Sequence, residues 1–223
     1  MKWIVEDRPL SDLLSIGKEN SMSLRFIGIT GGVGAGKSEI LKYISKHYSC
    51  VIYLADEVAK QVQQSGTDCF RKLVELLGRE IVGADGELDR RKMADRIFAD
   101  EALLEKVNEI VHPAVREYLL ARLEEAKEDE SIELFFVEAA LLIECGYGGL
   151  VDEMWYIYAD TASRINRLKQ ARGYSEEKIR NIMDSQLSEE VFRRESTFVI
   201  DNSKTLEDSY RQIDKKLEAF TWQ

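Results

Sequence analysis

Short apolar runs alternate along this chain with longer segments in which apolar residues recur at helical spacing. The runs are rich in β-branched and aromatic residues, and each is short enough to form a buried strand. They predict strands at 24–29, 51–54, 132–137, 153–159 and 197–201. Strands that alternate with helices indicate an α/β fold with an open, mostly parallel sheet that is covered on both faces.

Helical periodicity fills most of the chain between these runs. Ile40, Leu41 and Ile44 form an apolar stripe in a helix predicted over 37–48. Further helices are predicted over 161–172, from Ser175 onward and from about Thr205. Gly173 separates the first two of these, and Ser175 with its two following glutamates is typical of a helix start.

The segment 57–126 is mostly helical and is too long for a simple crossover between two strands. Turn signals at Gly66, Gly78 and the stretch ADGE (84–87) break it into pieces. We therefore expect a helical subdomain that projects from the edge of the sheet.

Composition and net charge limit the classes of protein to which this chain can belong. The chain has 223 residues, 44% of them hydrophobic and 32% charged, which suits one globular domain with a sizeable core. Its net charge of −10 repels nucleic acid and anionic membranes, so we expect neither as a partner. No apolar run is long enough to span a bilayer. We expect a monomer or a weak homo-oligomer.

The sequence also predicts a compartment. Acidic residues interrupt residues 1–23, so we expect no secretion signal there. Cys50, Cys69 and Cys145 are far apart and lack the spacing of a metal site, which favours the reducing cytoplasm.

A glycine-rich turn follows the first predicted strand. Gly31, Gly36, Lys37 and Ser38 match the phosphate-binding pattern G-x-x-x-x-G-K-[ST], with a strand before and a helix after. Backbone N–H groups and the helix N-terminus would cradle a polyphosphate, the lysine would reach the β- and γ-phosphates, and the serine hydroxyl would bind Mg²⁺.

Two other nucleotide-binding classes fit less well. The dinucleotide fingerprint G-x-G-x-x-G fails because, counted from Gly32, its last position is Lys37. A switch GTPase would need Asn-Lys-x-Asp and Asp-x-x-Gly, and neither occurs in the sequence. A kinase for a small molecule needs a base near the γ-phosphate, an acceptor pocket and mobile arginines.

Two acids follow predicted strands at the edge where the phosphate loop lies. Asp56 is a candidate general base, or alternatively the N-cap of a helix beginning at Glu57. Glu138 is a candidate for Mg²⁺ or its waters, or alternatively a strand-end carboxylate that faces solvent.

Basic residues offer further candidates. Arg164 and Arg167 share a helix face and, with Arg172, could neutralise charge on a transferred phosphoryl group; the alternative is a solvated face with salt bridges. Arg90 and Arg91 could serve the acceptor. His112 is either a catalytic-site residue or a packed core histidine.

From Leu24 onward the chain resembles the dephospho-coenzyme A kinase family along nearly its whole length. The matching stretches are IGITGGVGAGKS (27–38), ADEVA (55–59), GELDRRKMADRIF (86–98), NEIVHP (108–113), EAALLIECG (138–146), NRLKQARGYS (166–175) and VIDN (199–202). The first is shared with many kinases, whereas the ordered set is specific.

The resemblance implies transfer of the γ-phosphate of ATP, with Mg²⁺, to the ribose 3′-hydroxyl of dephospho-coenzyme A. It implies a P-loop three-layer fold with a five-stranded parallel sheet, a helical acceptor subdomain (about 60–127) and a helical lid (about 164–192). Its catalytic residues fall on Asp56 as base, Lys37 and Arg167.

The other implied site residues fall into three groups. The nucleotide would contact Gly31, Gly32, Val33, Gly34, Ala35, Gly36, Lys37, Ser38, Glu39 and Asn202. The acceptor would contact Asp56, Leu88, Arg90, His112, Pro113, Leu142 and Glu144. The metal would contact Ser38 and Glu138.

This chain departs from the usual family pattern at several positions. Leu54 stands where the first acid of Asp-Ala-Asp is usual, so Glu138 is expected to supply the missing carboxylate. Residues 1–23, including Met22, lie outside the resemblance and form an N-terminal extension to the single domain 24–223. A kinase for another hydroxyl acceptor and a non-catalytic nucleotide-binding regulator remain alternatives.

Overall fold

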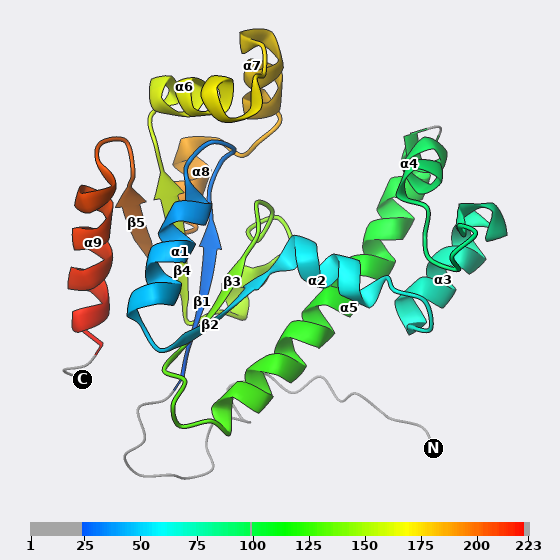
Figure 1. Cartoon of the computed structure of the whole chain (residues 1–223), viewed down its shortest axis with the longest axis horizontal. Coiled ribbons are helices and arrows are strands. Elements are labelled where there is room, and N and C mark those ends of the chain that lie inside the picture. Colours follow the sequence, from blue (N-terminus) through cyan, green and yellow to red (C-terminus); the bar gives the residue numbers. More distant parts are fainter. Residues whose placement is uncertain (1–23, 99, 221–223) are drawn as a thin grey trace.

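A five-stranded parallel sheet forms the centre of the protein (Figure 1). The structure is a computed structural model that describes residues 24–98 and 100–220. The strands lie in the order β2-β3-β1-β4-β5. Their bounds are β1 Arg25–Thr30, β2 Cys50–Leu54, β3 Leu134–Glu138, β4 Glu153–Tyr158 and β5 Phe198–Asp201. The predicted parallel sheet is confirmed, with every strand within two residues of its predicted position.

Helices cover both faces of the sheet because successive side chains of a strand point to opposite faces. Ile27 and Ile29 belong to the core cluster under α1 (Lys37–His47) and α9 (Leu206–Glu218). Phe26 belongs instead to the cluster under α5 (Glu101–Lys127). The result is the three-layer α/β arrangement that the sequence predicts.

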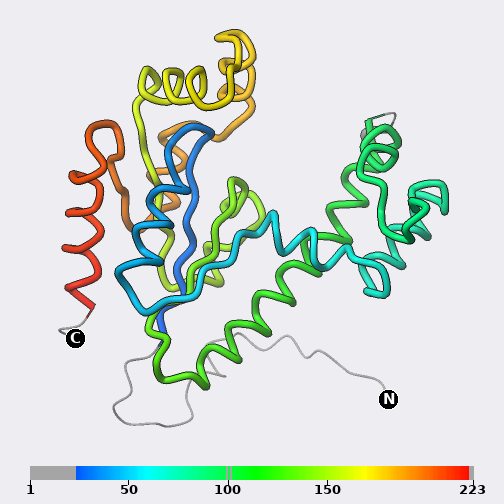
Figure 2. The backbone as a smooth tube through the Cα atoms, in the orientation of Figure 1, coloured from blue at the N-terminus to red at the C-terminus, as the bar shows by residue number. Residues whose placement is uncertain are grey.

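The chain between β2 and β3 leaves the sheet and returns to it (Figure 2). It runs out through α2 (Ala55–Val62) and α3 (Asp68–Leu77), turns through α4 (Arg90–Phe98) and comes back along α5. The distal parts of these helices form the projecting subdomain, which stands well away from α1 and α9 in Figure 1. Leu73, Leu77 and Ile81 are fully buried in this part of the chain, and they belong to the same core cluster as Phe26 of β1 and Phe135 of β3.

Two helices lie across the carboxyl ends of the central strands (Figure 1). They are α6 (Thr161–Arg172) and α7 (Glu176–Asp184), followed by the short α8 (Glu189–Arg194). We call α6 and α7 the upper helix pair. Ser175 caps α7 as the sequence predicts, because its side chain accepts a hydrogen bond from the Lys178 N–H.

Some local expectations need correction. The helix after β2 begins at Ala55 with Leu54 as its N-cap residue, so the alternative role of Asp56 as an N-cap is wrong. The sequence pattern predicts neither α8 nor the interruption at Asp100, whose side chain caps α5. Between residues 24 and 220, with residue 99 left aside, no helix has the length and apolar character that crossing a bilayer requires.

Candidate active site

The glycine-rich turn folds into a tight loop between β1 and α1. Gly31 has a φ of 148°, and a Cβ atom there would lie 2.5 Å from the carbonyl oxygen of Ile157, so only glycine fits. Gly36 occupies the N-cap position of α1 in the left-handed conformation, and no side chain caps this helix. The first N–H groups of a helix have no partner in a preceding turn. In α1 the N–H of Glu39 donates to the Gly36 carbonyl oxygen at 3.1 Å, which leaves those of Lys37 and Ser38 as donors that a ligand can use. An anion such as a phosphate group suits this position.

Lys37 reaches back over the loop from the first turn of α1. Its Nζ donates a hydrogen bond to the Gly31 carbonyl oxygen at 2.6 Å and lies 3.6 Å from Glu138 Oε1. Burial lowers the pKa of Lys37, while the charges of Glu138 and Asp56 oppose that shift. The ammonium group is therefore held over the loop by groups that a triphosphate could replace.

Glu138 and Asp56 stand at the carboxyl ends of neighbouring strands. Glu138 ends β3, and Asp56 lies in the first turn after β2, which pairs with β3. Burial raises the pKa of the Glu138 carboxyl, and the charge of Asp56 adds to the shift. The side chain of Glu138 is only 19% exposed, so the alternative of a solvent-facing carboxylate is wrong. The two acids thus share one electrostatic environment with Lys37.

Two arginines of α6 bind the outer side of the loop. Arg164 Nε donates to the Val33 carbonyl oxygen at 2.8 Å. Arg167 donates to the carbonyl oxygens of Ala35, at 3.2 Å, and Asn202, at 2.6 Å. These contacts exclude a freely solvated arginine face for both residues. They do not extend to Arg172, which is exposed and lies 5.9 Å from the ring of Tyr174.

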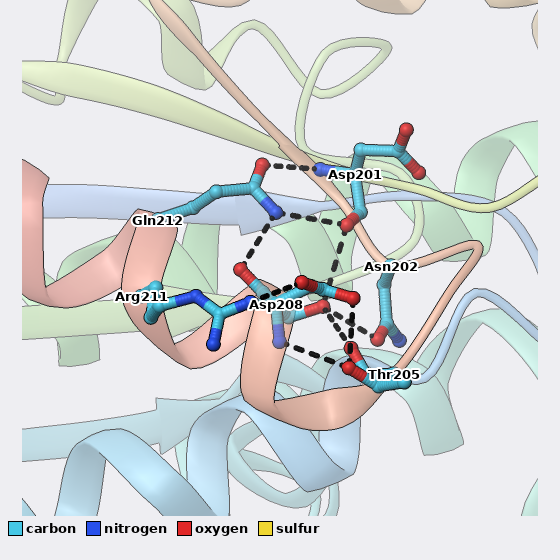
Figure 3. Close-up of polar contacts among 7 residues, drawn as sticks. Asp201, Asn202, Thr205, Asp208, Arg211 and Gln212 are labelled. Carbon is cyan, nitrogen blue, oxygen red and sulfur yellow. Dashed lines mark hydrogen bonds and ion pairs between the residues drawn. The ribbon is translucent and has the colours of Figure 1, made fainter.

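Asn202 is buried behind the loop rather than open to it. Only 1% of its surface is exposed. Its Nδ2 donates to the Ala35 carbonyl oxygen at 2.7 Å, and its Oδ1 accepts from Ser209 Oγ at 2.8 Å. Figure 3 shows Asn202 beside the capped start of α9, where Thr205 and Asp208 bind each other. In this structure the side chain therefore joins the phosphate loop to the C-terminal helix.

The predicted acceptor residues are distributed over two regions. His112 and Cys145 approach within 3.8 Å between Nδ1 and Sγ, so α5 meets the segment that follows β3. His112, Pro113 and Glu144 are exposed, which contradicts the alternative of a packed core histidine. Leu142 is buried beneath this segment, whereas Leu88 and the exposed Arg90 lie in the projecting subdomain. His112 thus lies beside Cys145, the chain neighbour of Glu144, whereas Arg90 begins α4.

The donors at the loop fit a magnesium–triphosphate group. Ser38 is exposed in the first turn of α1, and its hydroxyl and the Glu138 carboxylate at the end of β3 are oxygen donors of the kind that Mg²⁺ takes. Within the described residues, no group of three or more His, Cys, Asp and Glu forms a metal cage. Mg²⁺ commonly takes one or two protein oxygens and completes its shell with phosphate oxygens and water.

Gln186 contacts the loop, although no sequence pattern predicts it. Its Oε1 accepts hydrogen bonds from the Val33 N–H at 3.0 Å and from Arg164 Nη2 at 2.8 Å. It lies in the turn after α7, outside every periodic pattern and motif. No local sequence signal therefore predicts its position.

Known proteins resemble this chain over most of its length. A family model described as dephospho-CoA kinase matches residues 25–208. A dephospho-CoA kinase from Streptococcus mutans is 35% identical over 193 residues, which cover 86% of this chain and 96% of the relative. One from Listeria monocytogenes is 34% identical over 197 residues, with 87% and 96% covered.

Solved structures share the fold. A crystal structure of a Thermus thermophilus protein superposes with a TM-score of 0.72 at 30% identity, covering 88% of this chain and 98% of that one. A dephospho-CoA kinase from Campylobacter jejuni has a TM-score of 0.65 at 21% identity, covering 86% and 95%. A shikimate kinase from Acinetobacter baumannii, at 12% identity and a TM-score of 0.51, shares the fold alone, with 88% and 94% covered.

Proposed function

This chain belongs to the dephospho-CoA kinase family, and we propose that it transfers the γ-phosphoryl group of ATP to the ribose 3′-hydroxyl of dephospho-coenzyme A, giving coenzyme A. The observation that carries the proposal is the meeting of Lys37, Glu138 and Asp56 beside an uncapped helix N-terminus. These are the groups that binding a triphosphate and activating an alcohol require.

The loop and Lys37 perform the binding. The N–H groups at the start of α1 donate to phosphate oxygens. Lys37 exchanges its contact with the Gly31 carbonyl for the β- and γ-phosphates. Its charge then stabilises the negative charge of the transferring group.

Asp56 is the general base. Its carboxylate accepts the proton of the attacking 3′-hydroxyl as the new bond to phosphorus forms and the bond to the ADP oxygen breaks. It lies where the chain turns from the sheet toward the projecting subdomain, so it faces an acceptor that binds between the two. Ser38 and Glu138 would hold Mg²⁺, which neutralises phosphate charge.

The helices around the loop provide the remaining parts. A helical acceptor subdomain of about 60–127, which includes His112 and Pro113, receives the acceptor together with Glu144 of the segment after β3. The upper helix pair belongs to a lid of about 164–192, and Arg167 exchanges its carbonyl contacts for the transferring phosphoryl group as the lid closes. The three cysteines are free thiols, which suits a reducing compartment such as the cytoplasm.

A coupled assay of ADP release tests the function. Dephospho-coenzyme A, nucleosides and nucleoside monophosphates are each supplied with ATP and Mg²⁺, and a reaction without acceptor gives the background. We expect turnover with dephospho-coenzyme A and background rates with the others. Turnover on a nucleoside instead would identify another acceptor, and background rates throughout would identify a non-catalytic nucleotide-binding protein.

A further inference from the structure

The backbone of Val33 is held on both sides by residues that come after β4. Its N–H donates to Gln186 Oε1 at 3.0 Å, and its carbonyl oxygen accepts from Arg164 Nε at 2.8 Å. Arg164 also donates through Nη2 to the same Gln186 oxygen at 2.8 Å. The three groups form a closed ring of hydrogen bonds, which we call the Val33 clasp.

The clasp occupies space that only glycine leaves free. A Cβ atom on Gly32 would lie 2.4 Å from Arg164 Nη2 and 3.0 Å from Gln186 Oε1. Arg164 and Gln186 are both half-buried, and burial lowers the pKa of the Arg164 guanidinium. Because bulk water replaces lost partners poorly at such sites, the hydrogen bonds of the clasp are costly to lose.

We propose that Gln186 is a positioning residue. Together with Arg164 it fixes the backbone of Val33, and so it holds the phosphate loop in the shape that receives the triphosphate and joins that loop to the upper helix pair. This inference rests on the proposed function, because it assigns Gln186 to the same nucleotide site. Gln186 acts through the loop and makes no contact with the reacting atoms.

A neutral acceptor suits this position. A single amide oxygen accepts from both Val33 and Arg164 and adds no charge beside the phosphates. A carboxylate would accept the same two hydrogen bonds, yet it would pair with the Arg164 charge and repel the triphosphate. Gln186→Glu therefore separates the geometric part of the role from the electrostatic part.

The decisive variant is Gln186→Leu, which removes the acceptor with little change of size. Its matched control is Gln170→Leu on α6, because the exposed Gln170 donates only to Asn166 of the same helix in the described contacts. Calorimetry measures ATP binding, and hydrogen exchange measures protection of residues 31–36. Loss of the amide oxygen should weaken ATP binding about tenfold and speed exchange at Val33. The reason is that the Val33 N–H and Arg164 Nη2 lose their hydrogen-bond partner, and the free-energy cost of unpaired donors is large enough for a tenfold change in affinity.

The outcomes separate this proposal from a general loss of stability. For Gln186→Leu we expect the KM for ATP to rise more than kcat falls, whereas Gln170→Leu should match the wild type in both. Gln186→Glu should restore slow exchange at Val33 but keep ATP binding weak, and added salt should narrow the difference in ATP affinity between this variant and the wild type.

Equal ATP affinity and equal exchange in Gln186→Leu and Gln170→Leu would overturn the proposal. So would fast exchange at Val33 in a folded Gln186→Glu protein, which decides the matter even where the leucine variant does not fold. Calorimetry of ATP binding and hydrogen exchange at Val33 need no acceptor. Their results therefore stand even if dephospho-coenzyme A proves not to be the substrate.

Discussion

Replacing Asn202 by alanine tests whether this residue holds the phosphate loop before any nucleotide binds. The substitution removes the hydrogen bond from Nδ2 to the Ala35 carbonyl oxygen and the one that Oδ1 accepts from Ser209. It also leaves a small cavity, because the side chain is buried between the loop and α9. If the role of Asn202 is to join these segments, the protein without ligand should lose stability.

The structure sets the size of the effect. In the variant the Ala35 carbonyl oxygen still accepts a hydrogen bond from Arg167 at 3.2 Å. Ser209 Oγ can still donate to the carbonyl oxygens of Asp201 at 3.3 Å and Thr205 at 3.5 Å. The penalty is therefore close to two ordinary hydrogen bonds plus a small cavity, about 2 kcal/mol in total. For a chain of this size that corresponds to a melting temperature lower by about 4–8 °C.

Urea unfolding without nucleotide measures the change directly. The control is Asn181→Ala, an exposed position on α7, which should stay within about 0.5 kcal/mol of the wild type. The slope of the unfolding free energy against urea should be the same for all three proteins, so that the midpoint alone reports stability. Unchanged stability of Asn202→Ala, combined with weaker ATP binding, would refute the loop-holding role and favour direct contact with the nucleotide.

Two further substitutions test the charges at the site. Lys37→Ala should weaken ATP binding, measured by calorimetry, and lower turnover together, because the ammonium contacts phosphates in both the bound and the transition state; intact turnover at saturating ATP would contradict this. Glu138→Gln tests the raised pKa of that carboxyl: the folded protein holds the proton more readily than the unfolded chain, so wild-type stability relative to the variant should fall as the pH rises above the ordinary value of 4.5. Urea unfolding at a series of pH values checks the sign, and a relative stability that rises with pH would contradict it. The same variant should need more Mg²⁺ for half-maximal activity.

The sheet could be predicted from the sequence because its strands are compact apolar runs. Burial on both faces makes such runs nearly continuous, and this signal is independent of the rest of the chain. The helix starts at Ser175 and Thr205 could be predicted from equally local signals, because each side chain caps the helix that directly follows it. The six residues of α8 are too few to show a periodicity, which is why that helix was missed.

Lys37 and the phosphate loop could also be predicted from a local signal, because one short motif contains them. Asp56 and Glu138 could be assigned to the loop edge because they follow strands of a parallel sheet. The contacts of Gln186 and Asn202 with the loop could not be predicted. Gln186 is separated from Val33 by 153 positions and Asn202 from Ala35 by 167, and such distant residues meet only in the folded chain. The buried setting of Asn202 also shows that a matched motif can mark a position without revealing what its side chain contacts.

In the proposed mechanism the phosphate loop binds the triphosphate while Asp56 activates the alcohol that attacks it. Single-turnover conversion of dephospho-coenzyme A by wild type and Asp56→Asn, with ATP saturating and its affinity measured for both, tests this most directly. We predict ATP affinity within about threefold of the wild type and a transfer rate lower by about 10²–10⁴, the usual contribution of a general base. An Asp56→Asn protein that transfers the phosphoryl group at the wild-type rate would contradict the account.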